Sequence, residues 1–194
     1  GKIVVITGGG TGLGREMSLA MARAGANLVI ASRRTGPIEE VAGMARELGR
    51  HAIAVSTDVT DSEQVNRLMD RALKEFGQVD VLFNNAGIVR GQGATPIWDI
   101  TDDDWRIGIE TNMSSAFYCS RAIARHMVER GKGKIVNLSS GFGFRGGRDN
   151  YMYCVGKGGV VQLTRPLATS LGRYGITSTC IVPGFVPTEG TNES

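Results

Sequence analysis

Short apolar runs alternate along the chain with longer stretches in which apolar residues recur every three or four positions. The run IVVI at residues 3–6 has no polar member, as is typical of a strand buried on both faces of a parallel sheet. Apolar residues then follow helical spacing from residue 13 to residue 24, and Gly25 ends the predicted helix. The chain therefore begins with a strand followed directly by a helix.

The same alternation continues to the end of the chain. It predicts strands at residues 3–6, 27–32, 52–56, 79–83, 134–139 and 177–182, and helices at 13–24, 37–48, 60–76, 101–130 and 151–171. Pro37 is expected to open the second helix, and Thr60 with Glu63 to form a capping box on the third. Repeated strand–helix units predict an α/β fold with a doubly wound parallel sheet of Rossmann type, in strand order 3-2-1-4-5-6. We expect one domain over residues 1–194.

Composition narrows the functional classes. No apolar run approaches the ~20 residues that cross a bilayer, and residues 1–6 do not resemble a signal peptide, so we expect a cytoplasmic protein without membrane contact. The net charge of +3 is spread along the chain and aromatic residues are 6%, which disfavours nucleic acid as a partner. The three cysteines and two histidines stand apart from one another, so neither a disulfide framework nor a metal site is expected.

Glycines cluster between the first strand and the first helix, where the sequence reads TGGGTGLG from Thr7 to Gly14. At this place the backbone N–H groups and the helix dipole can hold the phosphates of a dinucleotide. The spacing is T-G-x-x-x-G-x-G rather than G-x-G-x-x-G, and a tight turn alone would also need glycine. The candidate phosphate-binding residues are Gly8, Gly10, Thr11, Gly12, Leu13 and Gly14.

Further motifs follow the later strands. They are Asn84-Asn85-Ala86-Gly87 after the fourth strand, Asn112 within a helix, Ser140 after the fifth strand, Tyr153 with Lys157 thirteen and seventeen positions later, and Pro183-Gly184 after the sixth. Groups that follow parallel strands gather at the carboxyl edge of the sheet, where such folds bind ligands. With these motifs, residues 2–188 resemble the short-chain dehydrogenase/reductase family, with similar likeness to its gluconate dehydrogenase and 3-oxoacyl-carrier-protein reductase branches.

The resemblance implies hydride transfer between a nicotinamide cofactor and an alcohol/carbonyl pair. Tyr153 would exchange a proton with the substrate oxygen, Ser140 would hydrogen-bond the same oxygen, and Asn112 would hold a helix distortion and a water that passes protons to Lys157. Tyr153 and Lys157 are four positions apart on a predicted helix, so they share a face, and an ammonium beside a phenol favours the phenolate. Ser139 and Ser140 should point to opposite faces, and the interval to Tyr153 selects Ser140.

The end of the second strand indicates which nicotinamide cofactor is used. An acid there would bond the adenosine ribose of NAD, but the sequence is Ser32-Arg33-Arg34, whose guanidinium groups suit the extra phosphate of NADP. Two solvated arginines are the alternative, so NAD stays possible. The resemblance also assigns cofactor contacts to Asp58, Val59, Asn85, Ala86, Gly87, Tyr153, Lys157, Pro183, Gly184, Val186 and Thr188.

The substrate is less readable. The loops at 88–95, 141–150 and from 185 onward should line its pocket, and Arg90, Arg145 and Arg148 could hold an anionic group or be solvated. Sugar or polyol derivatives and 3-oxoacyl thioesters both stay open, and a non-catalytic NADP-binding sensor or scaffold is the rival function. The resemblance suggests a homotetramer or dimer that packs through the helices at 101–130 and 151–171. It also leads us to expect that the family's seventh strand and C-terminal end are missing.

Overall fold

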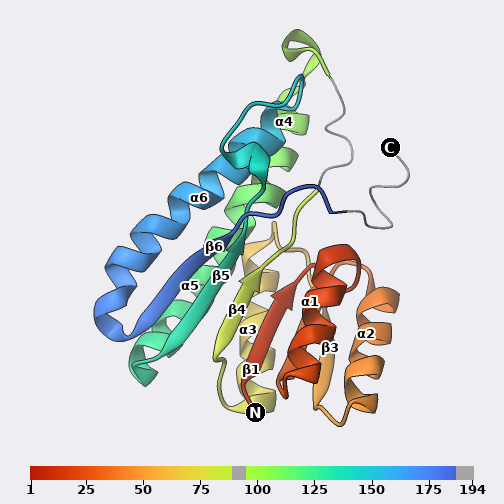
Figure 1. Ribbon diagram of the computed structural model, residues 1–194, viewed down its shortest axis with the longest axis vertical. Coiled ribbons are helices and arrows are strands. Elements are labelled where there is room, and N and C mark those ends of the chain that lie inside the picture. Colours follow the sequence, from red (N-terminus) through yellow and green to blue (C-terminus); the bar gives the residue numbers. More distant parts are fainter. Residues whose placement is uncertain (89–94, 187–194) are drawn as a thin grey trace.

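The computed structural model describes residues 1–88 and 95–186, which form a parallel sheet with helices on both of its faces (Figure 1). The strands are β1 (Ile3–Thr7), β2 (Asn27–Ser32), β3 (Ala52–Ser56), β4 (Val81–Asn84), β5 (Gly133–Leu138) and β6 (Ile176–Ile181). The helices are α1 (Gly12–Arg23), α2 (Thr35–Glu47), α3 (Ser62–Phe76), α4 (Asp102–Ile109), α5 (Ser115–Arg130) and α6 (Tyr151–Leu171). Short 3₁₀ turns lie at Ile97–Asp99, Gly141–Gly143 and Gly172–Tyr174.

All neighbouring strands are parallel, and their order is β3-β2-β1-β4-β5-β6. The predicted fold class and strand order are confirmed. β1 lies at the centre, where Val5 pairs with Val29 of β2 on one side and with Leu82 of β4 on the other. The order reverses at β1, so the carboxyl ends of β1 and β4 frame the crevice in which doubly wound sheets bind ligands.

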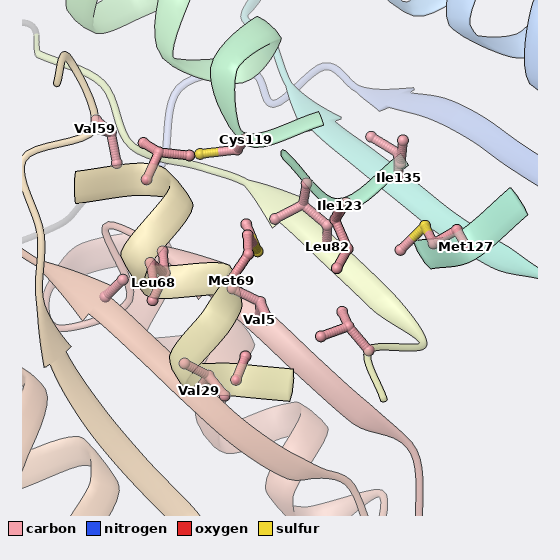
Figure 2. Packing of buried hydrophobic residues seen from close by; sticks show 14 of the residues in the cluster. Val5, Val29, Val59, Leu68, Met69, Leu82, Cys119, Ile123, Met127 and Ile135 are labelled. Atoms are coloured by element: carbon pink, nitrogen blue, oxygen red, sulfur yellow. The ribbon is translucent and has the colours of Figure 1, made fainter. Parts of the chain in front are cut away.

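Two buried clusters hold the helices to the sheet. On one face, Val4 and Ile6 of β1 pack with α1 and α2 through residues such as Leu19 and Ile38. On the other face, Val5 packs with α3 and α5, and Figure 2 shows how the side chains from both helices meet those of the strands. Alternate residues of β1 thus serve opposite faces, and all five of its residues are buried.

The helix predicted at 101–130 is interrupted. α4 and α5 are separated by a π-helical turn at Glu110–Ser114, although the helical path continues through it. α4 begins with a capping box between Thr101 and Asp104. α6 has the predicted bounds and runs through Pro166 in its second half.

Local details differ from expectation at two helix starts. Asp61, not Thr60, caps α3, and its carboxylate accepts hydrogen bonds from the backbone N–H groups of Glu63 and Gln64. Thr60 lies one residue before this cap, and its N–H and hydroxyl both donate to Asp58 Oδ1, which closes a turn before the helix. α2 begins at Thr35, so Pro37 lies inside the first turn, where its missing N–H costs no helical hydrogen bond.

Candidate active site

The glycine-rich turn is folded tightly between β1 and α1. Gly8 has a φ of +64°, a conformation that favours glycine, and its N–H donates to the Ala31 carbonyl at 2.7 Å. A Cβ on Gly14 would overlap the carbonyl oxygen of Gly8 and lie 2.6 Å from Asn85 Nδ2. These two glycines therefore bring the start of α1 directly against the end of β1.

The first turn of α1 has no side chain that neutralises its positive end. The N-cap residue Thr11 makes no side-chain capping bond, and no acid lies in the first turn. In contrast, Asp61 caps α3 and Thr101 caps α4. An uncapped helix N-terminus beside a glycine turn is suited to an anion such as a diphosphate.

A cleft of about 280 Å³ opens over this turn. Ten predicted cofactor residues line it, namely Gly8, Gly10, Thr11, Ser32, Arg33, Arg34, Asp58, Val59, Ala86 and Gly87. Four other residues line it as well, Pro37, Thr57, Ile88 and Thr111; Ile88 was expected in a loop of the substrate pocket, and the sequence reasoning missed the other three. Each of them except Pro37 immediately adjoins a predicted site residue, and that adjacency is the signal that could have found them. Gly12, Leu13, Gly14 and Asn85 are not among the lining residues.

Asn85 instead ties the two central strands together at this edge. Its Nδ2 donates to the carbonyl oxygens of Thr7 and Gly8 at 2.9 and 3.1 Å. The backbone N–H groups of Asn85 and Ala86 both donate to Thr7 Oγ1 at 3.1 Å. The segment after β4 is thus fixed against the end of β1, which places Ala86 and Gly87 in the wall of the cleft.

Arg33 and Arg34 are exposed at the mouth of the cleft, just beyond β2. Their backbone is held by two hydroxyl groups, since Ser56 Oγ donates to the Arg33 carbonyl and Ser32 Oγ to the Arg34 carbonyl. Among residues 1–88 and 95–186, neither guanidinium has an acidic partner within ion-pair distance. Both side chains are therefore available to an anionic ligand in the cleft.

Asn112 is buried within the π-helical turn and has 1% of its surface exposed. Ile88 donates its N–H to Asn112 Oδ1 at 3.0 Å, and Asn112 Nδ2 donates to the Ile88 carbonyl at 3.2 Å. The extra residue of a π turn displaces the helix at this point. The predicted helix distortion is present where Asn112 meets the segment that follows β4.

Lys157 is buried with 5% of its surface exposed, and its Nζ donates to the Leu138 carbonyl at 2.9 Å. Nζ lies 5.8 Å from the centre of the Tyr153 ring, so the two groups share one face of α6. Burial lowers the Lys157 pKa to about 8, because desolvation disfavours the charged form. A Cβ on Gly87 would lie 3.0 Å from Asn112 Oδ1 and 3.1 Å from Lys157 Nζ. The structure thus brings Gly87, Asn112, Tyr153 and Lys157 together.

The two serines after β5 have different surroundings. Ser139 is buried, and its Oγ donates to the Lys157 carbonyl at 2.7 Å. Ser140 is partly exposed, and among residues 1–88 and 95–186 the one hydrogen bond that its Oγ accepts comes from the N–H of Phe142, at 3.3 Å. The Phe142 ring packs edgewise on Tyr153 with 6.2 Å between ring centres. The 3₁₀ turn that begins at Gly141 thus lies next to the Tyr153 ring.

The segment after β6 passes the same edge. The Pro183 carbonyl accepts the N–H of Gly141 at 3.2 Å, and Gly184 and Val186 follow it as exposed residues. None of these three lines the cleft. Two other residues singled out in the sequence, Arg90 and Thr188, lie outside the described residues.

The part of the chain that the structure describes has neither a membrane-spanning helix nor a cluster of metal ligands. No helix there is both long enough and apolar enough to pass through a bilayer. No three or more His, Cys, Asp or Glu side chains gather there into a group that could hold a metal ion.

Known proteins that resemble this chain in sequence include dehydrogenases and reductases. The family model of the short chain dehydrogenases matches residues 2–194. The chain is 35% identical to the 2-dehydro-3-deoxy-D-gluconate 5-dehydrogenase of Escherichia coli K12, over 100% of the chain and 75% of that protein. It is 32% identical to the 3-oxoacyl-[acyl-carrier-protein] reductase of Synechocystis sp. PCC 6803, over 98% of the chain and 76% of that protein.

Solved structures agree with the sequence relatives. Levodione reductase superposes with a TM-score of 0.92 at 33% identity, over 97% of this chain and 73% of that one. A variant of actinorhodin polyketide ketoreductase with NADPH superposes with a TM-score of 0.93 at 29% identity, over 99% of this chain and 73% of that one. The chain belongs to the short-chain dehydrogenase/reductase family of oxidoreductases, which bind a nicotinamide cofactor and act on small molecules.

Proposed function

We propose that this chain transfers a hydride between NADP(H) and an alcohol/carbonyl substrate. The observation that carries the proposal is the buried ammonium of Lys157, which lies 5.8 Å from the Tyr153 ring beside the glycine at position 87. The relatives from Escherichia coli and Synechocystis favour two substrate classes, a sugar or polyol derivative and a 3-oxoacyl thioester. We also propose that residues 1–194 belong to one domain and that the protein is cytoplasmic.

The residues of the cleft fit a dinucleotide. The uncapped start of α1 and the backbone of Gly8, Gly10 and Thr11 would hold the diphosphate, as would the N–H groups of residues 12–14. Asp58 and Val59 would contact the adenine side, and residues 85–87 the adenosine ribose. The segment with Pro183, Gly184, Val186 and Thr188 would approach the nicotinamide end. When bound, the nicotinamide supplies or accepts the hydride.

The reacting oxygen would be handled by side chains of this chain. Tyr153 donates a proton to the carbonyl oxygen during reduction and removes the hydroxyl proton during oxidation. Ser140, whose hydroxyl accepts a long hydrogen bond from Phe142, donates to the same oxygen and orients it. Lys157 holds positive charge beside the phenol and binds the nicotinamide ribose. Asn112 keeps the π turn open so that a water can pass protons to Lys157.

The preference for NADP rests on the end of β2. An acid at position 32 would repel a 2′-phosphate, but that residue is Ser32 and its hydroxyl is turned to the Arg34 carbonyl. The guanidinium groups of Arg33 and Arg34 are exposed at the cleft, where they would pair with a phosphate in a bidentate manner.

The function is tested with the parent protein and Tyr153→Phe. We expect the parent to oxidise NADPH with a ketone or to reduce NADP with a polyol, and the variant to lose at least ~100-fold in kcat, since positioned acid–base groups supply 10²–10⁴-fold. Both proteins should bind NADPH with similar affinity. If the parent binds the cofactor without turnover, the proposed enzymatic activity is overturned and a role as a sensor or scaffold is supported.

The cofactor preference has its own experiment. In Arg33→Ala/Arg34→Ala, the affinity for NADPH should fall about tenfold or more while the affinity for NADH hardly changes, because only NADPH has the 2′-phosphate. Ser32→Asp should move the preference further toward NADH. An equal loss for both cofactors would contradict the proposed preference.

We further propose a homodimer or homotetramer. α4 and α5 expose Trp105, Ile107 and Phe117, with 43%, 57% and 44% of their surfaces accessible, and Val155 of α6 is 49% exposed. Exposed large apolar side chains are a feature that protein interfaces cover. Sedimentation equilibrium checks this assembly, and a monomer at micromolar concentration would exclude it.

A further inference from the structure

Three consecutive residues at the end of β5 are each hydrogen-bonded to α6. Asn137 Nδ2 donates to Thr164 Oγ1 at 2.9 Å, the Leu138 carbonyl accepts Lys157 Nζ at 2.9 Å, and Ser139 Oγ donates to the Lys157 carbonyl at 2.7 Å. The latter two bonds join the ammonium of Lys157 to Leu138, the last residue of β5, and its backbone carbonyl to Ser139, which follows that strand. Lys157 is thus held along its full length rather than at its tip alone.

The bond from Ser139 is enclosed by closely packed backbone. A Cβ on Gly143 would lie 2.6 Å from Ser139 Oγ and 2.8 Å from the Lys157 carbonyl oxygen. Ser139 itself is 5% exposed, and its N–H donates to the Ile181 carbonyl of β6 at 2.9 Å. Because the packing leaves Ser139 buried and the Gly143 backbone directly against it, the distance between Ser139 and this turn of α6 is set by that bond.

We propose that Ser139 is a positioning residue that sets where the Lys157 ammonium stands relative to Tyr153. The inference rests on the proposed function. It gives a role to Ser139, the serine that the motif spacing did not select. Ser139 does not face the substrate, and it acts only through the backbone of Lys157.

The surroundings of the ammonium explain why its position matters. The titratable groups that face it are Tyr153 on its own helix and the Cys180 thiol on β6. The remaining neighbours are neutral, namely Asn112, the backbone of Gly87 and the Leu138 carbonyl. No carboxylate among the described residues anchors the ammonium, so its place depends on hydrogen bonds from β5 and on packing.

The test compares Ser139→Ala with Thr164→Val. Thr164 also joins β5 to α6, through Asn137, and it is buried, but it lies seven residues from Lys157, about 10 Å along the helix. Both variants remove one buried hydroxyl between the same two elements. Thermal unfolding of the two proteins should therefore show similar losses, which makes Thr164→Val the control for a purely structural effect.

The first readout needs no turnover. In ¹³C-lysine NMR of the protein without cofactor, we expect the Lys157 pKa of Ser139→Ala to rise above that of the parent by about half a unit or more, because a loosened helix admits water to the ammonium. Thr164→Val should titrate like the parent. An unchanged Lys157 pKa in Ser139→Ala, or an equal shift in both variants, would overturn the proposal.

The second readout is catalytic. Ser139→Ala should lower kcat about tenfold or more with a KM for substrate close to that of the parent, and should move the acid limb of the oxidation rate to higher pH. Thr164→Val should retain the parent's profile. A parent without turnover would defeat the proposed function alone, since the NMR titration still decides whether Ser139 positions Lys157.

Discussion

Asn112 is hydrogen-bonded to both backbone groups of Ile88, accepting its N–H at 3.0 Å and donating to its carbonyl at 3.2 Å. The amide side chain thereby behaves like a strand neighbour for the segment that leaves β4. Because it projects from a π-helical turn, the widened helix and the loop that carries Ala86 and Gly87 are fixed to each other.

Asn112→Asp should therefore disturb more than one contact. The carboxylate keeps the acceptor for the Ile88 N–H but turns a second acceptor toward the Ile88 carbonyl. We expect the free energy of unfolding to fall by about 1–3 kcal/mol and turnover to fall more than cofactor affinity. Urea unfolding and steady-state kinetics check this, and a variant with unchanged stability would contradict the role of these bonds.

Lys157 should make stability depend on pH. Its folded pKa of about 8 lies below the ordinary 10.5, so the unfolded chain binds more protons between these values and stability rises with pH through that window. Below pH 8 the buried ammonium costs the protein about 3 kcal/mol. Lys157→Met should remove this cost, so the variant should be more stable than the parent at pH 7 and lose that advantage toward pH 10.5. Urea unfolding of both proteins from pH 7 to pH 10.5 measures the difference. A difference in the free energy of unfolding that stays constant over this range would contradict the prediction.

The close approach of α1 to β1 predicts an asymmetry between two helix glycines. Gly14→Ala should reduce the free energy of unfolding by about 1–3 kcal/mol and weaken cofactor binding, since its Cβ would overlap the Gly8 carbonyl. Gly43→Ala in α2 is the control, because its Cβ would meet only Arg46 Nη2 at 3.9 Å. There alanine should stabilise by about 0.5–1 kcal/mol. Chemical denaturation of both variants distinguishes these effects.

The loop after β5 distinguishes two arginines that the sequence could not rank. Arg145 lies over the Phe142 ring, 5.2 Å from its centre, and that ring packs on Tyr153. The side chain of Arg148 is 95% exposed and pairs with Asp149 at 3.6 Å. Arg145→Gln should raise KM about tenfold for a substrate that carries a carboxylate, but not for a neutral polyol.

Arg148→Gln is the matched control for that loop and should alter neither KM. Equal effects of the two arginine variants, or an effect of Arg145→Gln on the neutral polyol as well, would show that Arg145 does not bind the carboxylate.

The sequence predicts the fold well because its signals are local and repeated. Unbroken apolar runs such as residues 3–6 are compatible with a doubly covered strand, and helical spacing gave α6 its bounds even across Pro166. The predicted cap of α3 was wrong because Thr60 and Asp61 are both good capping residues, and the sequence does not reveal that Asp61 accepts the first free N–H groups of the helix while Thr60 bonds Asp58. The catalytic roles of Tyr153, Ser140 and Asn112 stay predictions.

The hydrophobic and polar pattern could not predict the contacts between residues that are far apart in the sequence. The alternation of side chains after β5 separates Ser139 from Ser140, but it does not reveal that Ser139 bonds the Lys157 carbonyl eighteen residues later. Likewise the π turn at Asn112 has no period of its own in the sequence, and it was expected only through the family resemblance. Thr57 and Thr111 enter the cleft because tertiary packing brings their segments to it.

The central place of β1 has a consequence for how the molecule forms. Thr7 is hydrogen-bonded to Asn85, 78 residues away, so the edge of the sheet beside the cleft joins two segments that are distant in the sequence. Closing so large a loop costs entropy before any contact repays it, and such distant pairings are slow. During refolding, helices should therefore be present before dinucleotide affinity, and that affinity should arise only once β4 has docked beside the first strand.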